Sequence, residues 1–382
     1  MQKIKIAFVV AVPLTARVFL LGHIACLQKK YEVHMIANYE GQSDLMAEFE
    51  AKGIICHHIS IMRQISLVKD VKAVFSLRRL FKKEHFLCVH SVTPKAGLIN
   101  ALAGRLAHIP HRVHIFTGQV WATRKGLLKT ILKKCDKLIA RLDTDLLVDG
   151  DGQRQFLIQE RILKEGNSMV PANGSIAGIQ LDKFVISEDV RKMERDRFGF
   201  SIENVVFIFL GRMNHDKGIG ELFAAFDRLV KDCPDARLLL YGIDEEGYDA
   251  MVGSYHNIKK DENYFFPGLT KEPYISLQGG DVFVLPTWRE GFGVSVLEAQ
   301  ALGLPVITSN CYGVVDASVN GVTGLRCGVN DVDGLYRCMK QYYESEILRK
   351  EHGLAGRKRV EELFDHEVVS EAWMDFYKKM LG

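Results

Sequence analysis

Two glutamates eight positions apart, Glu290 and Glu298, flank a short turn that holds Gly291 and Gly293. The turn lies between the apolar run DVFVLP and the helical stretch SVLEAQALG, so it joins a buried strand to a helix. The unpaired N–H groups of a helix start favour an anion such as phosphate, and glycine lets that anion approach the backbone closely. Phosphate repels a carboxylate, so the glutamates are better suited to accept hydrogen bonds from sugar hydroxyls.

Both glutamates also have a purely structural interpretation. Ser295 and Glu298 have the spacing of a capping box, in which Ser295 is the N-cap and Glu298 reaches back to it. Glu290 can be a solvated loop carboxylate paired with Arg289. The spacing alone favours neither interpretation over the functional one.

Two cations in a neighbouring turn strengthen the functional interpretation. Arg212 directly follows the apolar run FIFLG, and Lys217 stands where the next helical stretch begins. Arginine offers a forked grip on phosphate and lysine a compact charge. Cations from one turn and backbone amides from the other together predict a pyrophosphate pocket at the carboxyl ends of parallel strands.

Short apolar runs alternate with amphipathic stretches along the whole chain. This alternation indicates β-α units, and hence an α/β protein with two doubly wound parallel sheets. The expected strands of the first series are Ile4–Val10, Val33–Ala37, Ile54–Ile59, Leu87–Ser91, Val113–Thr117 and Lys137–Leu142, and those of the second are Val205–Leu210, Leu238–Tyr241, Tyr264–Phe266, Val282–Leu285 and Val306–Thr308.

The length of 382 residues exceeds what one hydrophobic core usually supports, so two domains are expected. We predict a first domain over 1–175, a second over 185–365, and a Gly- and Pro-containing linker over 171–184. The stretch 366–382 predicts a terminal amphipathic helix that can pack back on the first domain.

Charge is distributed unevenly over a chain whose net charge is only +3. Residues 1–185 hold 27 Lys and Arg against 15 Asp and Glu, which favours an anionic partner. The stretches 62–86 and 123–137 mix basic and apolar residues at helical spacing, as in helices that lie on anionic membranes, or in core-packing helices with a solvated basic face. No nucleic-acid recognition module is present, and no apolar run is long enough for a membrane span, so we expect a cytoplasmic protein without nucleic-acid partners.

The motifs GRMNHDKG, FFPGLT, DVFVLPTWREGFGVSVLEAQALGLPVITSN and GVTGLRC occur in this order in the second half. They resemble those of the retaining glycosyltransferases of family 4, of the type that assembles bacterial surface polysaccharides. The stretch VHSVTPKAGLINALAGRLAHIPHRVHIFTGQVWAT is similar to the acceptor-side domain of such enzymes. The resemblance implies a GT-B fold, in which two Rossmann-like domains face each other across a cleft.

The resemblance also implies roles for individual residues. Arg212 and Lys217 would hold the diphosphate of a nucleotide-sugar, which we expect to be a UDP-sugar. Glu290 would contact the transferred sugar and Glu298 the ribose. The remaining expected substrate contacts are Gly291, Phe292, Gly293 and Val294 at the sugar and phosphate, and Gly268 and Leu269 at the nucleobase. The leaving phosphate would accept the proton of the acceptor hydroxyl, so configuration would be retained with no cofactor beyond the donor. The acceptor would be a polyprenyl-diphosphate-linked saccharide, met by a peripheral enzyme at the inner face of the cytoplasmic membrane.

Two places in the first half depart from the family pattern or suggest other chemistry. Many members have a His-Gly or His-Asp pair, whose histidine contacts the donor sugar, where this chain has Thr117 and Gly118. His114, three residues earlier, is either a substitute for that histidine or a structural histidine. Asp143 and Asp145 have a spacing that holds a metal in another glycosyltransferase fold, but we expect N-capping and no metal, because Arg212 and Lys217 already neutralise the diphosphate. The alternatives to a transferase are a nucleotide-sugar 2-epimerase and a non-catalytic nucleotide-sugar-binding subunit.

Overall fold

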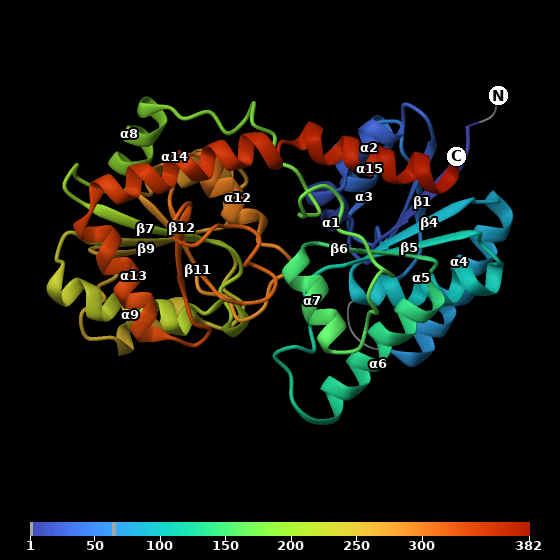
Figure 1. The fold of residues 1–382 in the computed structure, drawn as a ribbon, viewed down its shortest axis with the longest axis horizontal. Helices are drawn as coiled ribbons and strands as arrows, with labels where there is room; N and C mark the ends of the chain where they lie inside the picture. The colour runs from blue at the N-terminus through green and yellow to red at the C-terminus, as the bar shows by residue number, and fades with distance from the viewer. Residues whose placement is uncertain (1–2, 63–65) are drawn as a thin grey trace. The chain divides into compact units, whose positions relative to one another are not determined.

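The structure is a computed structural model that describes residues 3–62 and 66–382. The chain divides into two compact units (Figure 1). Unit 1 runs to Gly178 and takes up His366–Gly382 from the end of the chain, and unit 2 is Ile179–Asp365. The first boundary falls inside the Gly- and Pro-containing segment 171–184.

Within the described residues, unit 1 contains a six-stranded parallel sheet in the order β3-β2-β1-β4-β5-β6. Its strands are β1 (Lys5–Val9), β2 (Glu32–Ala37), β3 (Ile55–His58), β4 (Cys88–Val92), β5 (His111–Phe116) and β6 (Asp145–Val148). In β1, Ile6 and Phe8 face one hydrophobic core and Ala7 and Val9 face another, as the period of a strand requires. Both faces of this sheet are therefore covered.

Helices cover the two faces of this sheet. They are α1 (Pro13–Phe19), α2 (Leu21–Leu27), α3 (Ser43–Ala51), α4 (Leu67–Glu84), α5 (Pro94–Ala107), α6 (Gly126–Leu142), α7 (Asp151–Gln159) and α15 (His366–Leu381). In Figure 1, α4, α5 and α6 lie below the sheet, and α2, α3 and α15 lie above it. The N-terminal run that begins at Ile4 is the buried strand β1, and Pro13 then opens α1.

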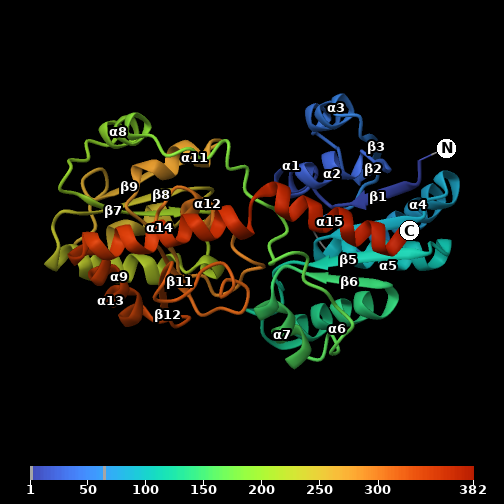
Figure 2. The same cartoon turned by 45° about the horizontal axis from the view of Figure 1, so that its top comes forward.

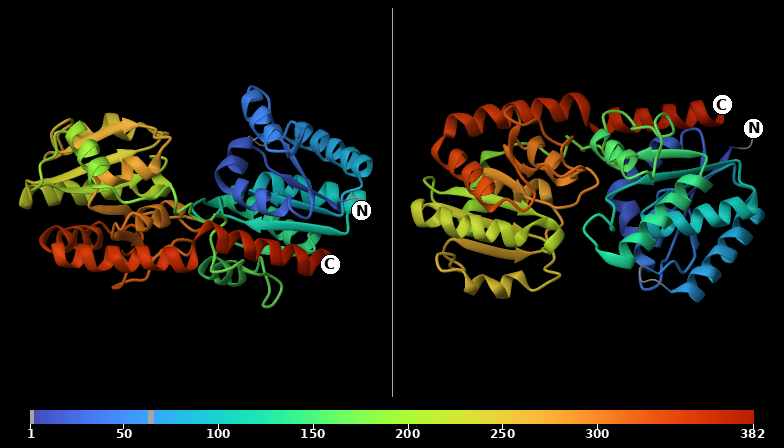
Figure 3. Two further views of the ribbon diagram at one scale, coloured as in Figure 1. Left: turned by 90° about the horizontal axis from the view of Figure 1, so that it is seen from above. Right: turned by 60° about the horizontal axis from the view of Figure 1, so that its bottom comes forward.

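The last helix, α15, packs beside α2 of unit 1 (Figure 2, Figure 3). The Trp373 ring stacks on the His23 ring at 4.5 Å and on the His90 ring at 5.1 Å between ring centroids. The Tyr377 hydroxyl hydrogen-bonds to Nδ1 of His90 at 2.8 Å. Burial lowers the pKa of His23 to about 4, so this aromatic stack is neutral at physiological pH.

Unit 2 has a second six-stranded parallel sheet in its described residues, in the order β12-β11-β10-β7-β8-β9. Its strands are β7 (Val205–Leu210), β8 (Ala236–Tyr241), β9 (Tyr264–Gly268), β10 (Val282–Leu285), β11 (Val306–Ser309) and β12 (Gly324–Cys327). Its helices are α8 (Glu188–Arg197), α9 (Ile219–Asp232), α10 (Tyr248–Met251), α11 (Pro273–Ser276), α12 (Val294–Ala301), α13 (Val332–Glu344) and α14 (Glu346–Leu363), with the short 3-10 helices η1 (His215–Lys217), η2 (Val252–Ser254) and η3 (Leu277–Gly279). Figure 1 shows α9 and α13 on one side of this sheet and α12 and α14 on the other.

The two parallel sheets confirm the predicted fold class, but two strands differ from expectation. Lys137–Leu142 is not a strand, because it is the end of α6, and the sixth strand is Asp145–Val148. The apolar residues of that stretch continue the three- and four-residue spacing of the preceding turns, which is a helical period. Strand β12 was not predicted, because its four residues include Arg326 and give no apolar run. Among the described residues, no helix combines the length and the apolar character needed to cross a bilayer.

Candidate functional site

The predicted cations and the first glutamate lie where the strand order of unit 2 reverses. From β7 the chain adds β8 and β9 on one side of the sheet, and then adds β10, β11 and β12 on the other. Such a switch point leaves a crevice at the carboxyl ends of the strands, where open α/β sheets bind ligands. Arg212 and η1 follow β7, and the loop that carries Glu290 follows β10, so both turns belong to this edge.

Two glycines let the loops at this edge come together. Gly218, with φ of +71°, ends η1, and a Cβ built on it would lie 2.1 Å from the carbonyl oxygen of Pro286. A Cβ on Gly313, in the loop after β11, would lie 1.8 Å from the carbonyl oxygen of Glu290. No side chain fits at either position, so the turn after β7 and the loops after β10 and β11 form one packed cluster.

Opposite charges pair across the two turns. Each turn carries two neighbouring charges of opposite sign, Asp216 with Lys217 and Arg289 with Glu290. Lys217 forms an ion pair with Glu290, and the Arg289 guanidinium lies 2.6 Å (Nη2) and 3.1 Å (Nε) from Oδ2 of Asp216. All four side chains are at most 19% exposed. Arg289 therefore neutralises Asp216 rather than Glu290.

Hydrogen bonds to backbone atoms hold these turns in register. Oγ1 of the fully buried Thr287 lies 2.8 Å from the carbonyl oxygen of Asp216. The backbone N–H of Trp288 donates to the same carbonyl at 2.8 Å, and the Ser309 hydroxyl donates to the carbonyl of Thr287. Asp216 and Thr287 were not identified from the sequence, and Arg289 was considered there only as a partner of Glu290. The pair of adjacent opposite charges in each turn is the signal that could have found Asp216 and its pairing with Arg289.

We expect Asp216 and Arg289 to be energetically coupled. If one of them is replaced, the other remains as a mostly buried charge that has lost its partner and is not fully hydrated. A double-mutant cycle of Asp216→Asn and Arg289→Gln, followed by urea unfolding, should give a coupling energy of about 1–2 kcal/mol. The matched cycle uses the exposed pair of Arg228 and Asp333, which should couple by less than about 0.5 kcal/mol. Equal coupling in the two cycles would mean that the inner pair does not hold the turns together.

Arg212 is paired with a residue that the sequence analysis did not single out. Its Nη1 lies 3.2 Å from both carboxylate oxygens of Glu245, in the loop after β8. Glu245 also accepts a hydrogen bond from Nδ2 of Asn214 at 2.7 Å. The Arg212 side chain is 47% exposed. Both predicted phosphate-binding cations thus face a carboxylate, and an incoming diphosphate would have to replace Glu245 and Glu290 as their partner.

Glu298 is not part of a capping box. The helix α12 begins at Val294, and its N-cap is Gly293, whose φ of +98° lets the backbone enter the helix two residues before the predicted N-cap Ser295. Glu298 is partly buried, and burial raises its pKa to about 7. Its carboxyl has no hydrogen-bond or ion-pair partner in the part of the chain that the structure describes. A carboxylate that lacks a donor in the protein is suited to accept hydrogen bonds from a ligand.

The other predicted contacts of unit 2 take different positions. Gly268 ends β9 with a φ of +87°, and Leu269 after it is 65% exposed. Phe292 is buried, and its ring centroid lies 5.5 Å from that of Phe364, so its side chain belongs to the core. Val294 is the first residue of α12. Because the Phe292 side chain lies in the core, only its backbone atoms are free to contact a ligand.

The three candidates of the first half belong to unit 1. His114 lies in β5 and is 1% exposed, and its Nδ1 is 2.9 Å from the Ser91 hydroxyl. Its ring packs so closely on Gly97 that a Cβ there would lie 2.4 Å away, and burial lowers the pKa of His114 to about 3. These contacts favour the structural role of His114. Thr117 and Gly118 follow the end of β5, where the Thr117 carbonyl accepts a hydrogen bond from Gln153 at 2.7 Å.

Asp143 and Asp145 follow the end of α6 rather than the strand expected over 137–142, and neither is the N-cap of a helix, so the N-capping prediction is wrong. Asp143 is the residue after the last turn of α6, and Asp145 begins β6. Burial raises the pKa of Asp143 well above its ordinary value, which favours the neutral acid. In residues 3–62 and 66–382, no group of three or more His, Cys, Asp or Glu side chains is arranged to hold a metal ion.

Comparisons with known proteins bear on both units. Residues 190–359 match the family model described as glycosyl transferases group 1, and residues 16–173 match the glycosyl transferase 4-like domain. The chain is 32% identical over 361 residues to the capsular polysaccharide biosynthesis glycosyltransferase CapM of Staphylococcus aureus, covering 94% of this chain and 93% of that protein. It is 26% identical to the UDP-Gal:alpha-D-GlcNAc-diphosphoundecaprenol alpha-1,3-galactosyltransferase of Escherichia coli, covering 91% and 90%. The solved structure of Anabaena HepE with UDP-glucose has the same fold, with a TM-score of 0.82 at 15% identity over 98% of this chain and 99% of that one.

Proposed function

The chain belongs to the glycosyltransferases of family 4, and from this premise we propose that it moves a sugar from a UDP-sugar onto a polyprenyl-diphosphate-linked saccharide. Glycosyltransferase is the activity shared by the family models and both relatives. The names of those relatives support the finer proposal, since one acts in capsule biosynthesis and the other on a diphosphoundecaprenol-linked sugar. The product would be an intermediate of a capsule or O-antigen type of polysaccharide.

The observation that carries this proposal is the ion pair between Lys217 and Glu290 across two turns at the switch point of unit 2. A diphosphate placed there would meet Lys217 and Arg212, and it would free Glu290 to accept hydrogen bonds from the hydroxyls of the donor sugar. Glu298 would accept hydrogen bonds from the ribose, since its carboxyl has no partner in the described part of the protein. Gly268 and Leu269 would border the nucleobase.

The chemistry proposed for this site needs no separate general base. The acceptor hydroxyl oxygen forms a bond to the anomeric carbon while the bond from that carbon to the phosphate oxygen breaks. The proton of the hydroxyl passes to the departing diphosphate, on the face from which the acceptor attacks, so the configuration is retained. Arg212 and Lys217 stabilise the charge that develops on the diphosphate, and we propose that they do so without a metal ion.

A lipid-linked acceptor is held in a bilayer, so we also propose that the enzyme works in the cytoplasm as a peripheral protein of the membrane's inner face. The excess of basic residues in the first half supports this setting, because anionic lipids attract them by about 1 kcal/mol for each Lys or Arg near the surface.

A thermal-shift panel of nucleotides and nucleotide-sugars tests the proposed function directly. A UDP-sugar at a hundred times its dissociation constant should stabilise the protein by about 2.7 kcal/mol, and GDP- and ADP-sugars should stabilise it less. The same shift is expected with and without a chelator such as EDTA, because side-chain cations neutralise the diphosphate. If no nucleotide-sugar raises the melting temperature, the assignment of the donor site is wrong. If EDTA abolishes the shift, the metal-free mechanism is wrong.

A further inference from the structure

Helix α4 of unit 1 exposes large apolar side chains that the proposed reaction does not use. Its inner side packs into the core through Ala73, Val74, Leu77 and Phe81. Its outer side carries Leu67, Val68, Val71 and Phe75, which are 79%, 68%, 54% and 57% exposed. Apolar side chains that gather on one surface usually mark a binding surface.

The charged residues of α4 also differ between its inner and outer sides. The two acidic residues of the helix face basic residues of other elements, with Asp70 2.6 Å from Lys95 and Glu84 3.1 Å from Lys5. Glu84 also lies 3.9 Å from Lys83. Within residues 3–62 and 66–382, neither Lys72 nor Arg79 forms an ion pair. Arg78 donates to the Leu106 carbonyl of α5 at 3.3 Å, and the exposed cations of α4 are Lys69, Lys72, Arg79, Lys82 and Lys83. The outer side of α4 is therefore both apolar and strongly positive.

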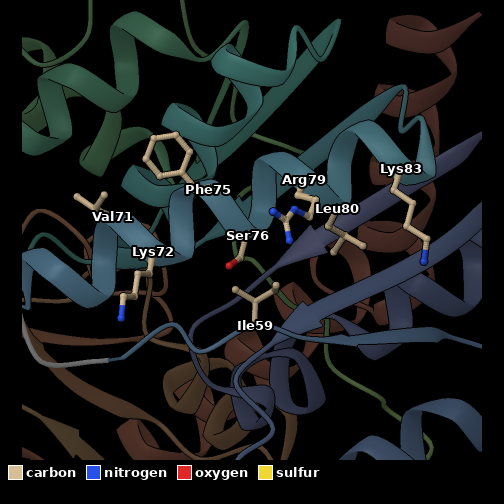
Figure 4. Close-up of a pocket in the computed structure, with 8 residues that line it drawn as sticks. All are labelled: Ile59, Val71, Lys72, Phe75, Ser76, Arg79, Leu80 and Lys83. Atoms are coloured by element: carbon tan, nitrogen blue, oxygen red, sulfur yellow. The ribbon is translucent and has the colours of Figure 1, made fainter.

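A groove of about 570 Å³ runs along this side of α4 and is bordered by Ile59, the residue after β3 (Figure 4). It is lined by Ile59, Val71, Lys72, Phe75, Ser76, Arg79, Leu80 and Lys83. Figure 4 shows Lys72 and Lys83 at its two ends, with Arg79 between them. The volume lies within the range of small-molecule sites. The combination of an apolar lining with basic side chains suits an anionic amphiphile.

We propose that the outer side of α4 binds an anionic phospholipid bilayer. Arg79 and Lys72 contact the phosphate of a lipid headgroup at the groove, and Val68, Val71 and Phe75 insert between the acyl chains below it. The inference rests on the proposed function for its setting, a lipid-linked acceptor, and it names the surface by which the enzyme reaches the membrane. Vesicle binding itself requires neither donor nor acceptor, so the two proposals can fail separately.

Other partners fit this surface less well. Nucleic acid would satisfy the cations, but it offers nothing to the four exposed apolar side chains. A second copy of the chain would bring the same positive surface against itself, with Asp70 and Glu84 already engaged. A soluble phosphate would leave the apolar residues in water. A bilayer of anionic lipid satisfies both kinds of side chain at once.

Helix α6, which packs on α5 as α4 does, shows a related pattern and provides an internal comparison. It exposes Leu127, Leu128, Ile131 and Leu138 among Lys134, Lys137 and Arg141. Helix α5 packs against both α4 and α6, so the three helices form one layer. The groove lies on α4, and α4 is therefore the helix to which we assign lipid binding.

The test measures co-sedimentation of the full-length protein with vesicles of phosphatidylcholine, alone or mixed with phosphatidylglycerol. The wild-type protein should bind the mixed vesicles and not the neutral ones. The double variant Lys72→Glu/Arg79→Glu should bind the mixed vesicles about tenfold or more weakly. Val71→Ser/Phe75→Ser should weaken binding by a similar factor. The matched control Lys350→Glu/Lys358→Glu changes the net charge equally on α14, where both lysines pair with glutamates, and should bind as the wild type does.

Each outcome decides the proposal. The far-UV circular dichroism spectrum and the melting temperature, measured on the same samples, should be unchanged in the α4 variants, which shows that they are folded without reference to donor binding. Equal binding to neutral vesicles, or loss of binding in the α14 control, would overturn the proposal. So would the result that Lys134→Glu/Lys137→Glu on α6 abolishes binding while the α4 variants retain it. If inorganic phosphate alone occupied the groove at Arg79 and displaced the vesicles, the groove would be a site for a soluble anion. If vesicle binding behaved as expected but no UDP-sugar bound, only the proposed function would fail.

Discussion

Replacing Glu290 with glutamine should lower the rate of sugar transfer by about a hundredfold to a thousandfold, while UDP binds as tightly as before or more tightly. In the ligand-free protein Glu290 neutralises Lys217, so it competes with the diphosphate for that cation. Glutamine removes the competitor, which favours UDP. It also removes the negative charge that we place against the donor sugar, where positive charge develops in the transition state. Steady-state kinetics and calorimetric titration with UDP measure the two effects separately.

The control for this experiment is Asp333→Asn, which likewise changes an acid to its amide. Asp333 pairs with Arg228 on the exposed surface of unit 2, between α13 and α9. It should leave both the transfer rate and UDP affinity unchanged. If Glu290→Gln reduced UDP affinity and transfer by the same factor, Glu290 would act only by holding Lys217 in place, and its contact with the sugar would be wrong. A retained transfer rate would remove Glu290 from the site altogether.

The position of the candidate site could be predicted because it depends on local signals. Apolar runs gave β7 and β10, and in a doubly wound sheet the turns after such strands lie at one edge. Arg212, Lys217 and Glu290 each follow a strand in the sequence, so their shared location followed from topology. The prediction of a strand over 137–142 was wrong, because a short apolar run alone does not distinguish a strand from the end of a longer helix.

The partners of these residues could not be predicted, because they depend on tertiary packing. The pairing of Arg212 with Glu245 joins the loops after β7 and β8, and that of Asp216 with Arg289 joins those after β7 and β10. Neither is visible in the spacing of one motif. The capping box at Ser295 failed because Gly293, with a φ of +98°, starts the helix earlier. The steric need for Gly218 and Gly313 likewise appears only when neighbouring loops are in place.

The second large expected effect is the pH dependence of stability that Glu298 causes, because its carboxyl is desolvated and no donor within the described residues offsets this. Burial raises its pKa to about 7 from an ordinary value of 4.5. As pH rises, the unfolded chain therefore loses this proton before the folded one does. The stability that the protonated group contributes is lost between about pH 4.5 and pH 7 and changes no further above that range. The wild-type protein should lose roughly 2–3 kcal/mol relative to Glu298→Gln between about pH 4 and pH 8. Urea unfolding of both proteins across this range measures the difference.

Nucleotide binding should depend on pH in the opposite direction. Ribose hydroxyls that donate to Glu298 stabilise its carboxylate and lower its pKa in the complex, so binding releases a proton and tightens as pH rises. We expect UDP affinity to increase about tenfold from about pH 5.5 to pH 8 beyond the change seen in Glu298→Gln, which reports the titration of the phosphate alone. Calorimetry in two buffers of different protonation enthalpy counts the released proton. If the wild-type and glutamine proteins show the same pH dependence, the ribose is not bound by Glu298, and its raised pKa reflects burial in α12 alone.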